Sequence, residues 1–485
     1  MTRRSFLISL IITLNLIIFK QAGVLYANLQ NSNDPKVKYV FLFIGDGMGQ
    51  AQVNLTQAYL SALEDKVGFK PLTFTGFPYV GFVSTYAANQ MITCSAAAGT
   101  ALATGNKTNT GRISMDPEGK TSFESIASKA KKNGFKVGIL TNVSIDHATP
   151  AAFYAHQPDR DQYFDIGKQL TNTDFDLFAG GGFIDPDSTI DGQTINLVKL
   201  AEEKGFYIVN TKEKFDALAT DFKSKTLILS PRTTSEGSMP YSIDMDPWDI
   251  TMADYTSKAI SLLTNDQGFF MMVEGGKIDW VCHDNDAASM IHEVIAFDKA
   301  VENAFSFYQK HPEETLIIVT ADHETGGLSL GNSVTGYDSH LDLLKYQRSS
   351  IEGLNQMIAQ FRVNKSGDSE ADFNKLMKAL DLEMGINSHQ RGTQLSEEEI
   401  YIMKGIFMET VYNPDGSTSK RSYVEPLISK ALEIMATKAG ISWCSHAHTC
   451  VNVPVYAIGP GAERFTGYID NTDIPRLIGE VMGIW

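Results

Sequence analysis

Residues 316–323 read Leu-Ile-Ile-Val-Thr-Ala-Asp-His, an apolar run that ends in a carboxylate and an imidazole. Three further apolar runs lead into acidic, histidine or threonine side chains: residues 41–44, 137–140 and 269–273. Apolar runs of this length are typical of strands buried on both faces, as in a parallel sheet covered by helices. Because the carboxyl ends of such strands form one crevice, we expect the polar side chains there to converge.

The chain between Lys38 and Thr325 alternates between strand-like and helix-like patterns. The last strand is predicted at Val453–Ile458, and helices are predicted at Ser122–Asn133, Thr194–Lys204 and Ala287–Gln309. This alternation predicts an α/β fold with a central, mostly parallel sheet flanked by helices on both faces.

Residues 332–443 have a different pattern, because strongly apolar strands are absent and helical periodicity takes their place. Helices are predicted at Leu341–Phe361, Asp372–Leu380 and Glu397–Tyr412. We interpret residues 28–485 as one α/β domain that carries a helical insertion at 332–443. The insertion could overhang the crevice, contact another subunit, or form a solvated cap.

Residues 1–27 have the pattern of an export signal. Arg3 and Arg4 precede an apolar run at residues 6–19, and small residues follow it. That run is shorter than the roughly 20 apolar residues that a membrane span needs. We therefore expect a cleaved signal and a periplasmic or secreted protein without a stable membrane span. The paired arginines are typical of the twin-arginine route, the general secretory route is equally compatible, and a retained N-terminal anchor is the remaining alternative.

The chain of 485 residues is 43% hydrophobic and 20% charged, which is typical of a globular protein with a large core. Its net charge of −16 and the absence of a basic block argue against a nucleic-acid backbone as partner. A phosphorylated substrate is compatible with this charge, because bound cations reverse the local potential. The four cysteines do not indicate a disulfide framework, and Cys444 and Cys450 could pair only across a loop.

The most unusual segment is residues 91–105, where Ser95 opens a predicted helix made almost entirely of small side chains. A helix N-terminus favours an anion, and small side chains allow a ligand to approach closely. A serine hydroxyl becomes a nucleophile only beside a base or a metal. An ordinary helix-capping serine is the alternative interpretation.

Seven acidic and histidine side chains are candidate metal ligands: Asp46, Glu274, Asp279, His283, Asp322, His323 and His448. Asp279 and His283 are four residues apart, which places both on one face of a helical turn, a common ligand geometry. His448 is the weakest candidate when it is taken alone. Such side chains converging without matching positive charge indicate divalent metal ions.

Together, these motifs and their order resemble the alkaline phosphatase family, from Val40 to about Ile458 apart from the insertion. The resemblance implies a phosphate monoester hydrolase in which Ser95 becomes phosphorylated and Arg160 holds two phosphate oxygens. It also implies two zinc ions and one magnesium ion. The implied ligand sets are Asp46, Asp322 and His323 for one zinc, Asp279, His283 and His448 for the other, and Asp46, Thr149 and Glu274 for magnesium.

Three residues depart from the family pattern. Cys94 replaces the aspartate that usually precedes the nucleophile and helps to orient the arginine, so we expect Arg160 to be held more loosely. His147 stands where some bacterial members carry aspartate, and Trp280 stands where other members carry lysine or histidine. These two departures bear on magnesium affinity and on the pH optimum.

The alternatives are a phosphodiesterase of the same superfamily and a non-catalytic protein that binds metal or phosphate. Arg160, Thr149 and Glu274 favour the monoesterase, because in the family they contact a nonbridging oxygen that a diester would substitute. A sulfatase is disfavoured, because Cys94 is not followed by the Pro and Arg of the C-x-P-S-R pattern. Since family members are commonly homodimers, the resemblance also implies a homodimer.

Overall fold

The computed structural model describes residues 37–234, 236–412 and 424–485. The predicted export signal at residues 1–27 lies outside the described residues. Within them, no helix combines the length and the apolar character that crossing a bilayer requires.

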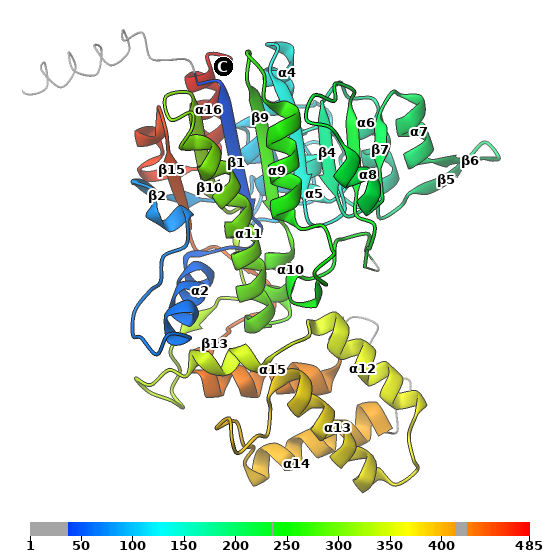
Figure 1. Cartoon of the computed structure of the whole chain (residues 1–485), viewed down its shortest axis with the longest axis vertical. Coiled ribbons are helices and arrows are strands. Elements are labelled where there is room, and N and C mark those ends of the chain that lie inside the picture. Colours follow the sequence, from blue (N-terminus) through cyan, green and yellow to red (C-terminus); the bar gives the residue numbers. More distant parts are fainter. Residues whose placement is uncertain (1–36, 235, 413–423) are drawn as a thin grey trace, which may run out of the picture. The chain divides into compact units, whose positions relative to one another are not determined.

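A ten-stranded sheet forms the centre of the α/β fold (Figure 1). Its strands run in the order β16 (Gly467–Asp470), β2 (Tyr79–Ser84), β15 (Val453–Ile458), β10 (Thr315–Thr320), β1 (Tyr39–Gly45), β9 (Phe269–Gly275), β3 (Lys136–Thr141), β4 (Leu177–Gly180), β8 (Thr226–Leu229) and β7 (Tyr207–Val209). Every neighbouring pair is parallel except those of β15, which is antiparallel to both β10 and β2. The mostly parallel sheet predicted from the apolar runs is therefore confirmed.

The central strands are the apolar runs that the sequence singles out. Every residue of β1, β9 and β10 is buried. Burying a Leu, Ile or Phe side chain stabilises a fold by about 1.5–3 kcal/mol, so these strands form the middle of the core. The phenyl ring of Phe43 on β1 meets that of Phe297 edge-on, with centroids 5.8 Å apart.

Helices cover both faces of the sheet. On one face α9 (Met252–Leu263) and α11 (Ala287–Tyr308) pack against each other and over the central strands (Figure 1). The other face carries α3 (Ser95–Thr104), α4 (Ile126–Lys132) and α16 (Asp473–Met482), and α3 contacts both of the others. This arrangement confirms the prediction of helices on both faces.

The predicted helix at residues 287–309 is confirmed as α11, whereas two others begin later than predicted. The helix expected from Ser122 begins at Ile126, because the side chain of Ser125 accepts a hydrogen bond from the Ser128 backbone and caps α4. The helix expected from Thr194 is α7 (Leu197–Glu203). The residues before it form β6 (Gln193–Asn196), which pairs with β5 (Asp187–Ile190) in a short hairpin.

A helical region lies between two short strands that pair with each other, β12 (Ser329–Leu330) and β13 (Ile441–Ser442). Its helices are α12 (Ile351–Val363), α13 (Ser369–Met384), α14 (Glu397–Ile406) and α15 (Pro426–Ala439). The prediction of one helix over 341–361 is wrong in one respect. A 3₁₀ turn at Leu341–Tyr346 precedes α12, and the Ser350 side chain caps the new helix by accepting from the Glu352 backbone.

Candidate active site and metal centres

The polar ends of β10, β1, β9 and β3 lie at one edge of the sheet. In the parallel register Ile44 lies opposite both Thr320 and Glu274, and Thr141 lies opposite Glu274 on its other side. Residues that follow these strands are therefore held a few ångströms apart by backbone pairing, as expected for the carboxyl edge of a parallel sheet.

The first cluster at this edge consists of Asp46, Asp322 and His323, all fully buried. One ligand atom from each lies within 4.8 Å of the others. Nε2 of His323 lies 3.4 Å from Oδ1 of Asp46 and 3.2 Å from Oδ2 of Asp322. The same nitrogen lies 3.4 Å from the hydroxyl oxygen of Ser95. The predicted nucleophile therefore stands directly beside this cluster.

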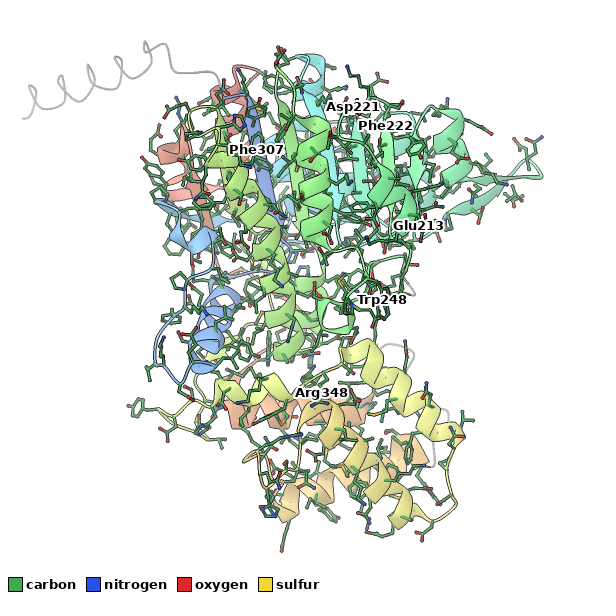
Figure 2. The ribbon with its side chains drawn as sticks, viewed as in Figure 1. Glu213, Asp221, Phe222, Trp248, Phe307 and Arg348 are labelled. Atoms are coloured by element: carbon green, nitrogen blue, oxygen red, sulfur yellow. The ribbon has the colours of Figure 1, made fainter. Side chains whose placement is uncertain are left out.

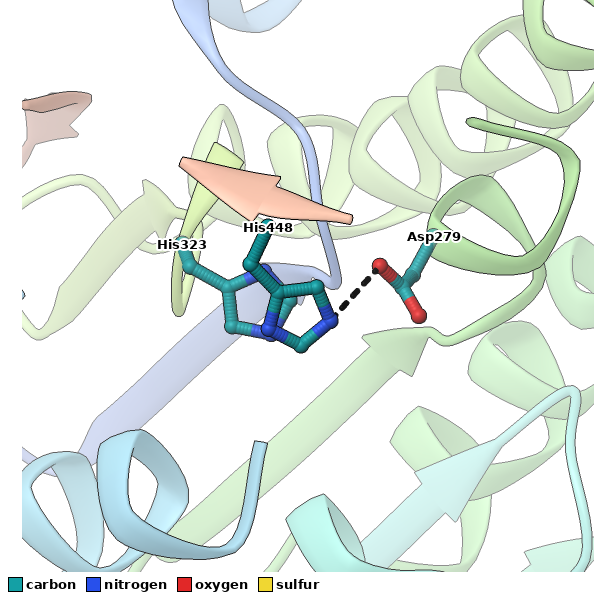
Figure 3. Close-up of side chains that lie close together, drawn as sticks. All are labelled: Asp279, His323 and His448. Carbon is teal, nitrogen blue, oxygen red and sulfur yellow. Dashed lines mark ion pairs between the residues drawn. The ribbon is translucent and has the colours of Figure 1, made fainter. Parts of the chain in front are cut away.

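A second cluster involves the histidines that the sequence places on separate segments. Helix α10 (Lys277–His283) carries Asp279 and His283 one turn apart, as their spacing predicts. The side chains of Asp279, His323 and His448 come together (Figure 3), with Nε2 of His448 lying 3.5 Å from Oδ1 of Asp279. Nε2 of His283 lies 3.0 Å from Nε2 of His448 and 3.4 Å from Oδ2 of Asp279. All three predicted ligands of the second zinc therefore meet.

Backbone carbonyls orient two of these imidazoles. Nδ1 of His283 lies 2.7 Å from the carbonyl oxygen of His446, and Nδ1 of His448 lies 2.9 Å from that of Thr93. A ring nitrogen that faces a carbonyl must carry the hydrogen, so in the neutral form of each ring Nε2 would direct its lone pair toward the cluster. This arrangement is usual for metal-binding histidines.

A third cluster consists of Asp46, His147 and Glu274, and the hydroxyl of Thr149 lies beside the Glu274 carboxyl. Thr141 donates a hydrogen bond of 2.5 Å to Oε2 of Glu274. The other oxygen of Glu274 and the hydroxyl of Thr149 are buried and find no hydrogen-bond partner among the described residues. The predicted magnesium ligands are thus adjacent and carry unused oxygen atoms.

The chemistry of the clusters matches divalent cations. Both oxygens of Asp46 and Oδ2 of Asp322 are buried without a hydrogen-bond partner among the described residues. Burial, followed by the charge of Asp322, raises the pKa of Asp46 well above its ordinary value, and burial raises the pKa of Glu274 to about 8. Buried carboxylates normally have partners, since an isolated buried charge is costly. Bound cations would supply the missing positive charge at each of these oxygens.

The serine helix reaches the clusters because its side chains are small. Ser95 is the first residue of α3 and is only 2% exposed, while the next residues are alanines and Gly99. A Cβ atom at Gly99 would lie 3.3 Å from Cα of Thr149 and from Cβ of Ala152, so the helix packs closely on the segment that carries Thr149. The first backbone N–H groups of α3 are therefore available to an anion at Ser95.

A family model described as alkaline phosphatase matches residues 37–484. The chain belongs to the alkaline phosphatase family. It is 31% identical over 469 residues to alkaline phosphatase 4 of Bacillus subtilis, a match covering 94% of this chain and 91% of that protein. Alkaline phosphatase 3 of the same organism is 31% identical over 464 residues, covering 93% and 90%.

Solved structures of the family have the same fold. A cold-active alkaline phosphatase from a psychrophilic Shewanella sp. superposes with a TM-score of 0.75 at 28% identity, covering 92% of this chain and 99% of that one. The alkaline phosphatase of Thermus thermophilus gives a TM-score of 0.74 at 27% identity, with 93% of each chain covered. This chain is thus a phosphatase of a metal-dependent family, and the three clusters are its candidate metal-binding residues.

In this member of the alkaline phosphatase family, the three residues that depart from the family pattern, Cys94, His147 and Trp280, are all connected to Arg160. Nη2 of Arg160 lies 3.2 Å from Nε2 of His147. The His147 ring in turn meets the Trp280 ring edge-on, with centroids 5.8 Å apart. Cys94 contacts the arginine segment only indirectly, because its sulfur accepts from the Gly111 backbone, whose carbonyl accepts from the Arg160 backbone. The guanidinium of Arg160 is therefore in direct contact with the imidazole of His147.

Two further residues, His147 and Thr325, lie among the predicted ligands of this phosphatase. His147, one of the three departures from the family pattern, lies within the third cluster, in agreement with its expected influence on magnesium affinity. Thr325 donates to Oδ1 of Asp279 at 2.5 Å and fixes that carboxylate. The sequence signal for Thr325 is its position two residues after the candidate ligand His323. The disulfide considered for Cys444 and Cys450 is absent, and both cysteines are free.

Proposed function

We propose that the protein is a secreted alkaline phosphatase that hydrolyses phosphate monoesters through a phosphoserine at Ser95 and releases inorganic phosphate. One observation carries the proposal. The hydroxyl of Ser95 lies 3.4 Å from a histidine that shares its cluster with two buried carboxylates. A hydroxyl at a helix N-terminus beside such a cluster is a candidate activated nucleophile.

The proposed cofactors are two zinc ions and one magnesium ion. Asp46, Asp322 and His323 would hold the zinc nearest Ser95, whereas the second zinc and the magnesium would be held by Asp279, His283 and His448 and by Asp46, Thr149 and Glu274, respectively. When bound, such ions activate a hydroxyl or water and stabilise the charge on entering and leaving oxygens. The mixed oxygen and nitrogen donors of the first two clusters suit zinc, whereas the third offers mainly oxygens, as magnesium prefers.

The remaining residues of the site bind and orient the phosphoryl group. The planar guanidinium of Arg160 can donate two parallel hydrogen bonds to nonbridging oxygens. Attack by the Ser95 oxygen forms a new bond to phosphorus while the bond to the substrate alcohol breaks. Water then displaces Ser95 from phosphorus by the same in-line geometry. Two inversions retain the configuration at phosphorus.

A comparison of aryl phosphate monoester and diester turnover at alkaline pH tests the proposal. We expect the monoester to be hydrolysed faster, because Arg160 contacts oxygens that a diester would substitute. Faster turnover of the diester would make the protein a phosphodiesterase of the same superfamily.

Export and assembly are further parts of the proposal. Residues 1–27 are proposed to be removed on export, which amino-terminal sequencing of the periplasmic or secreted protein would test. A homodimer is proposed from the family, and light scattering of the purified protein measures its mass directly. A mature protein that begins at Met1, or a monomer at micromolar concentration, would contradict the respective statement.

A further inference from the structure

A cavity of about 1610 Å³ opens from Ser95 and extends well beyond the three clusters. Its inner part is lined by Ser95, His147, Arg160, Asp279, His283 and His448. Pockets of about 300–1000 Å³ bury most of a drug-sized molecule, so this cavity has room for far more than a phosphoryl group. The excess volume must receive the alcohol part of a substrate.

The far wall of the cavity comes from the helical region. All of residues 348–356 except Ser350 and Leu354 line it, a segment that includes the first turn of α12, together with Ser429 of α15. Figure 2 labels Arg348, whose exposed side chain stands at the start of this segment.

Two sets of hydrogen bonds fix that wall to the rest of the chain. The backbone N–H of Ser350 donates to Oδ1 of Asp244 at 2.9 Å, and the Ser350 hydroxyl donates to the other oxygen of the same carboxylate. The side-chain amide of Gln347 donates to both oxygens of Asp286 at 2.9 Å. Because Asp286 is buried and caps α11, the wall is attached to a rigid element.

Acidic side chains outnumber basic ones in this outer part of the cavity. Among the described residues that line it, the carboxylates are Glu236, Asp244, Asp246, Asp284 and Glu352, and the arginines are Arg232 and Arg348. Arg232 is already engaged by Asp249, with Nε at 3.2 Å from Oδ1. The buried Lys277 lies against Tyr241, a residue of the lining: its ammonium is 3.5 Å from the centre of the Tyr241 ring and donates to the Met239 carbonyl.

The rest of the outer lining is neutral. It contains both apolar side chains and hydroxyl or amide groups: Ile184, Pro240, Ile243, Met245, Thr233, Thr234, Ser349 and Gln356. Such a surface can pack against a carbon chain and hydrogen-bond to hydroxyl groups.

We propose that residues 348–356, together with Glu236, bind the alcohol part of the substrate and select extended phosphate monoesters whose alcohol part is neutral or cationic. The proposal rests on the monoesterase activity proposed above and adds the substrate class. A second negative charge, as in a nucleoside polyphosphate or a carboxylated alcohol, would face Glu236 and Glu352 in a lining where, among the described residues, carboxylates outnumber the arginines. Repulsion between like charges in a partly desolvated site weakens binding by about tenfold or more.

The first experiment compares ω-amino, ω-hydroxy and ω-carboxy alkyl phosphates of equal chain length on the metal-loaded enzyme. We expect kcat/KM to be at least about tenfold lower for the carboxylate than for the amine, with the alcohol between them. Equal values for the three esters, or a preference for the carboxylate, would overturn the inference.

Charge-neutralising variants identify the responsible residues. The double variant Glu236→Gln/Glu352→Gln is expected to reduce the amine-to-carboxylate ratio of kcat/KM to within about threefold of unity. The matched control is Glu397→Gln/Glu398→Gln, which removes two exposed charges from the first turn of α14 outside the cavity and should leave the ratio unchanged. An unchanged ratio in the first variant would refute the role of these carboxylates.

A size variant tests the wall independently of charge. Gln356→Trp should lower kcat/KM for a long-chain alkyl phosphate several-fold more than for methyl phosphate, since the indole occupies the outer cavity. Gln360→Trp lies on an exposed part of α12 outside the cavity and is the control. Equal losses of kcat/KM for both esters would contradict the proposal that residues 348–356 bind the alcohol part. Absence of turnover on every monoester would instead contradict the proposed function itself.

Discussion

The guanidinium of Arg160 and the imidazole of His147 are in direct contact, with Nη2 lying 3.2 Å from Nε2. Burial, and then the charge of Arg160, lowers the pKa of His147 to about 3, so the ring is neutral and its Nε2 accepts the hydrogen bond. An uncharged acceptor therefore contacts Arg160, the arginine that we propose binds phosphate, whereas the family pattern has an aspartate at the position of Cys94. Substitutions of His147 and of Cys94 test how Arg160 is positioned.

Replacement of His147 should weaken phosphate binding. His147→Leu removes the acceptor, and one hydrogen bond is worth about 1 kcal/mol, so we expect the inhibition constant for inorganic phosphate to rise about fivefold. His147→Gln keeps an acceptor and should show a smaller change. Magnesium content is measured in parallel, because His147 also belongs to the third cluster. Equal inhibition constants for the wild type and the leucine variant would contradict the positioning role.

A carboxylate at position 94 should have the opposite effect. Cys94→Asp would add a charged partner two hydrogen bonds away from Arg160, through Gly111. We expect inhibition by inorganic phosphate to become several-fold tighter, since hydrogen bonds to charged partners are the stronger ones. Cys94→Ser is the uncharged control. An unchanged inhibition constant in the aspartate variant would contradict this prediction and show that the existing contacts already position Arg160 fully.

Removal of the nucleophile separates catalysis from metal binding. Ser95→Ala should lower kcat for an aryl monoester by about 10³-fold or more, because losing a nucleophile removes the covalent route. Its zinc and magnesium content, measured by mass spectrometry, should match the wild type. The control Ser257→Ala changes an exposed serine on α9 and should retain full activity. Full activity in Ser95→Ala would leave only a binding role for the site.

Chelation should abolish activity and lower the melting temperature. The clusters gather Asp46, Glu274 and Asp322 without cationic side chains of their own, and burial raises the pKa of Asp322 to about 7. Cations that bind the folded state alone stabilise it by mass action. We expect two zinc ions and one magnesium ion per chain, lost on chelation and regained with activity on re-addition. Unchanged activity in fully chelated protein would exclude a role for metals.

The contact between α11 and β1 should be important for stability. Phe297 is fully buried, and its ring centroid lies 5.8 Å from that of Phe43 and 6.2 Å from that of Phe74. Phe297→Ala should lower the free energy of unfolding by about 3–5 kcal/mol, measured in urea. Phe69→Ala is the matched control, because that side chain is 57% exposed and its loss should change little.

Local patterns predicted most of the sheet but not the boundaries of several helices. The runs at β1, β9 and β10 are apolar on both faces, a pattern typical of a covered parallel sheet. The 3₁₀ turn before α12 could not be predicted from local sequence. It is followed by Gln347, whose side chain hydrogen-bonds to Asp286, a residue 61 positions earlier in the chain. The same holds for the antiparallel direction of β15, which carries no signature in its own residues.

The sequence by itself determined which side chains follow the buried strands, and parallel pairing then required those side chains to share an edge of the sheet. Only the tertiary structure decided that His448, from the far end of the chain, stacks on His323 with ring centroids 3.6 Å apart. It also decided that Arg160 contacts His147 and that residues 348–356 line the cavity beyond Ser95. The physical reason is range: apolar periodicity reports burial one element at a time, whereas contacts between distant segments depend on how all the elements pack together.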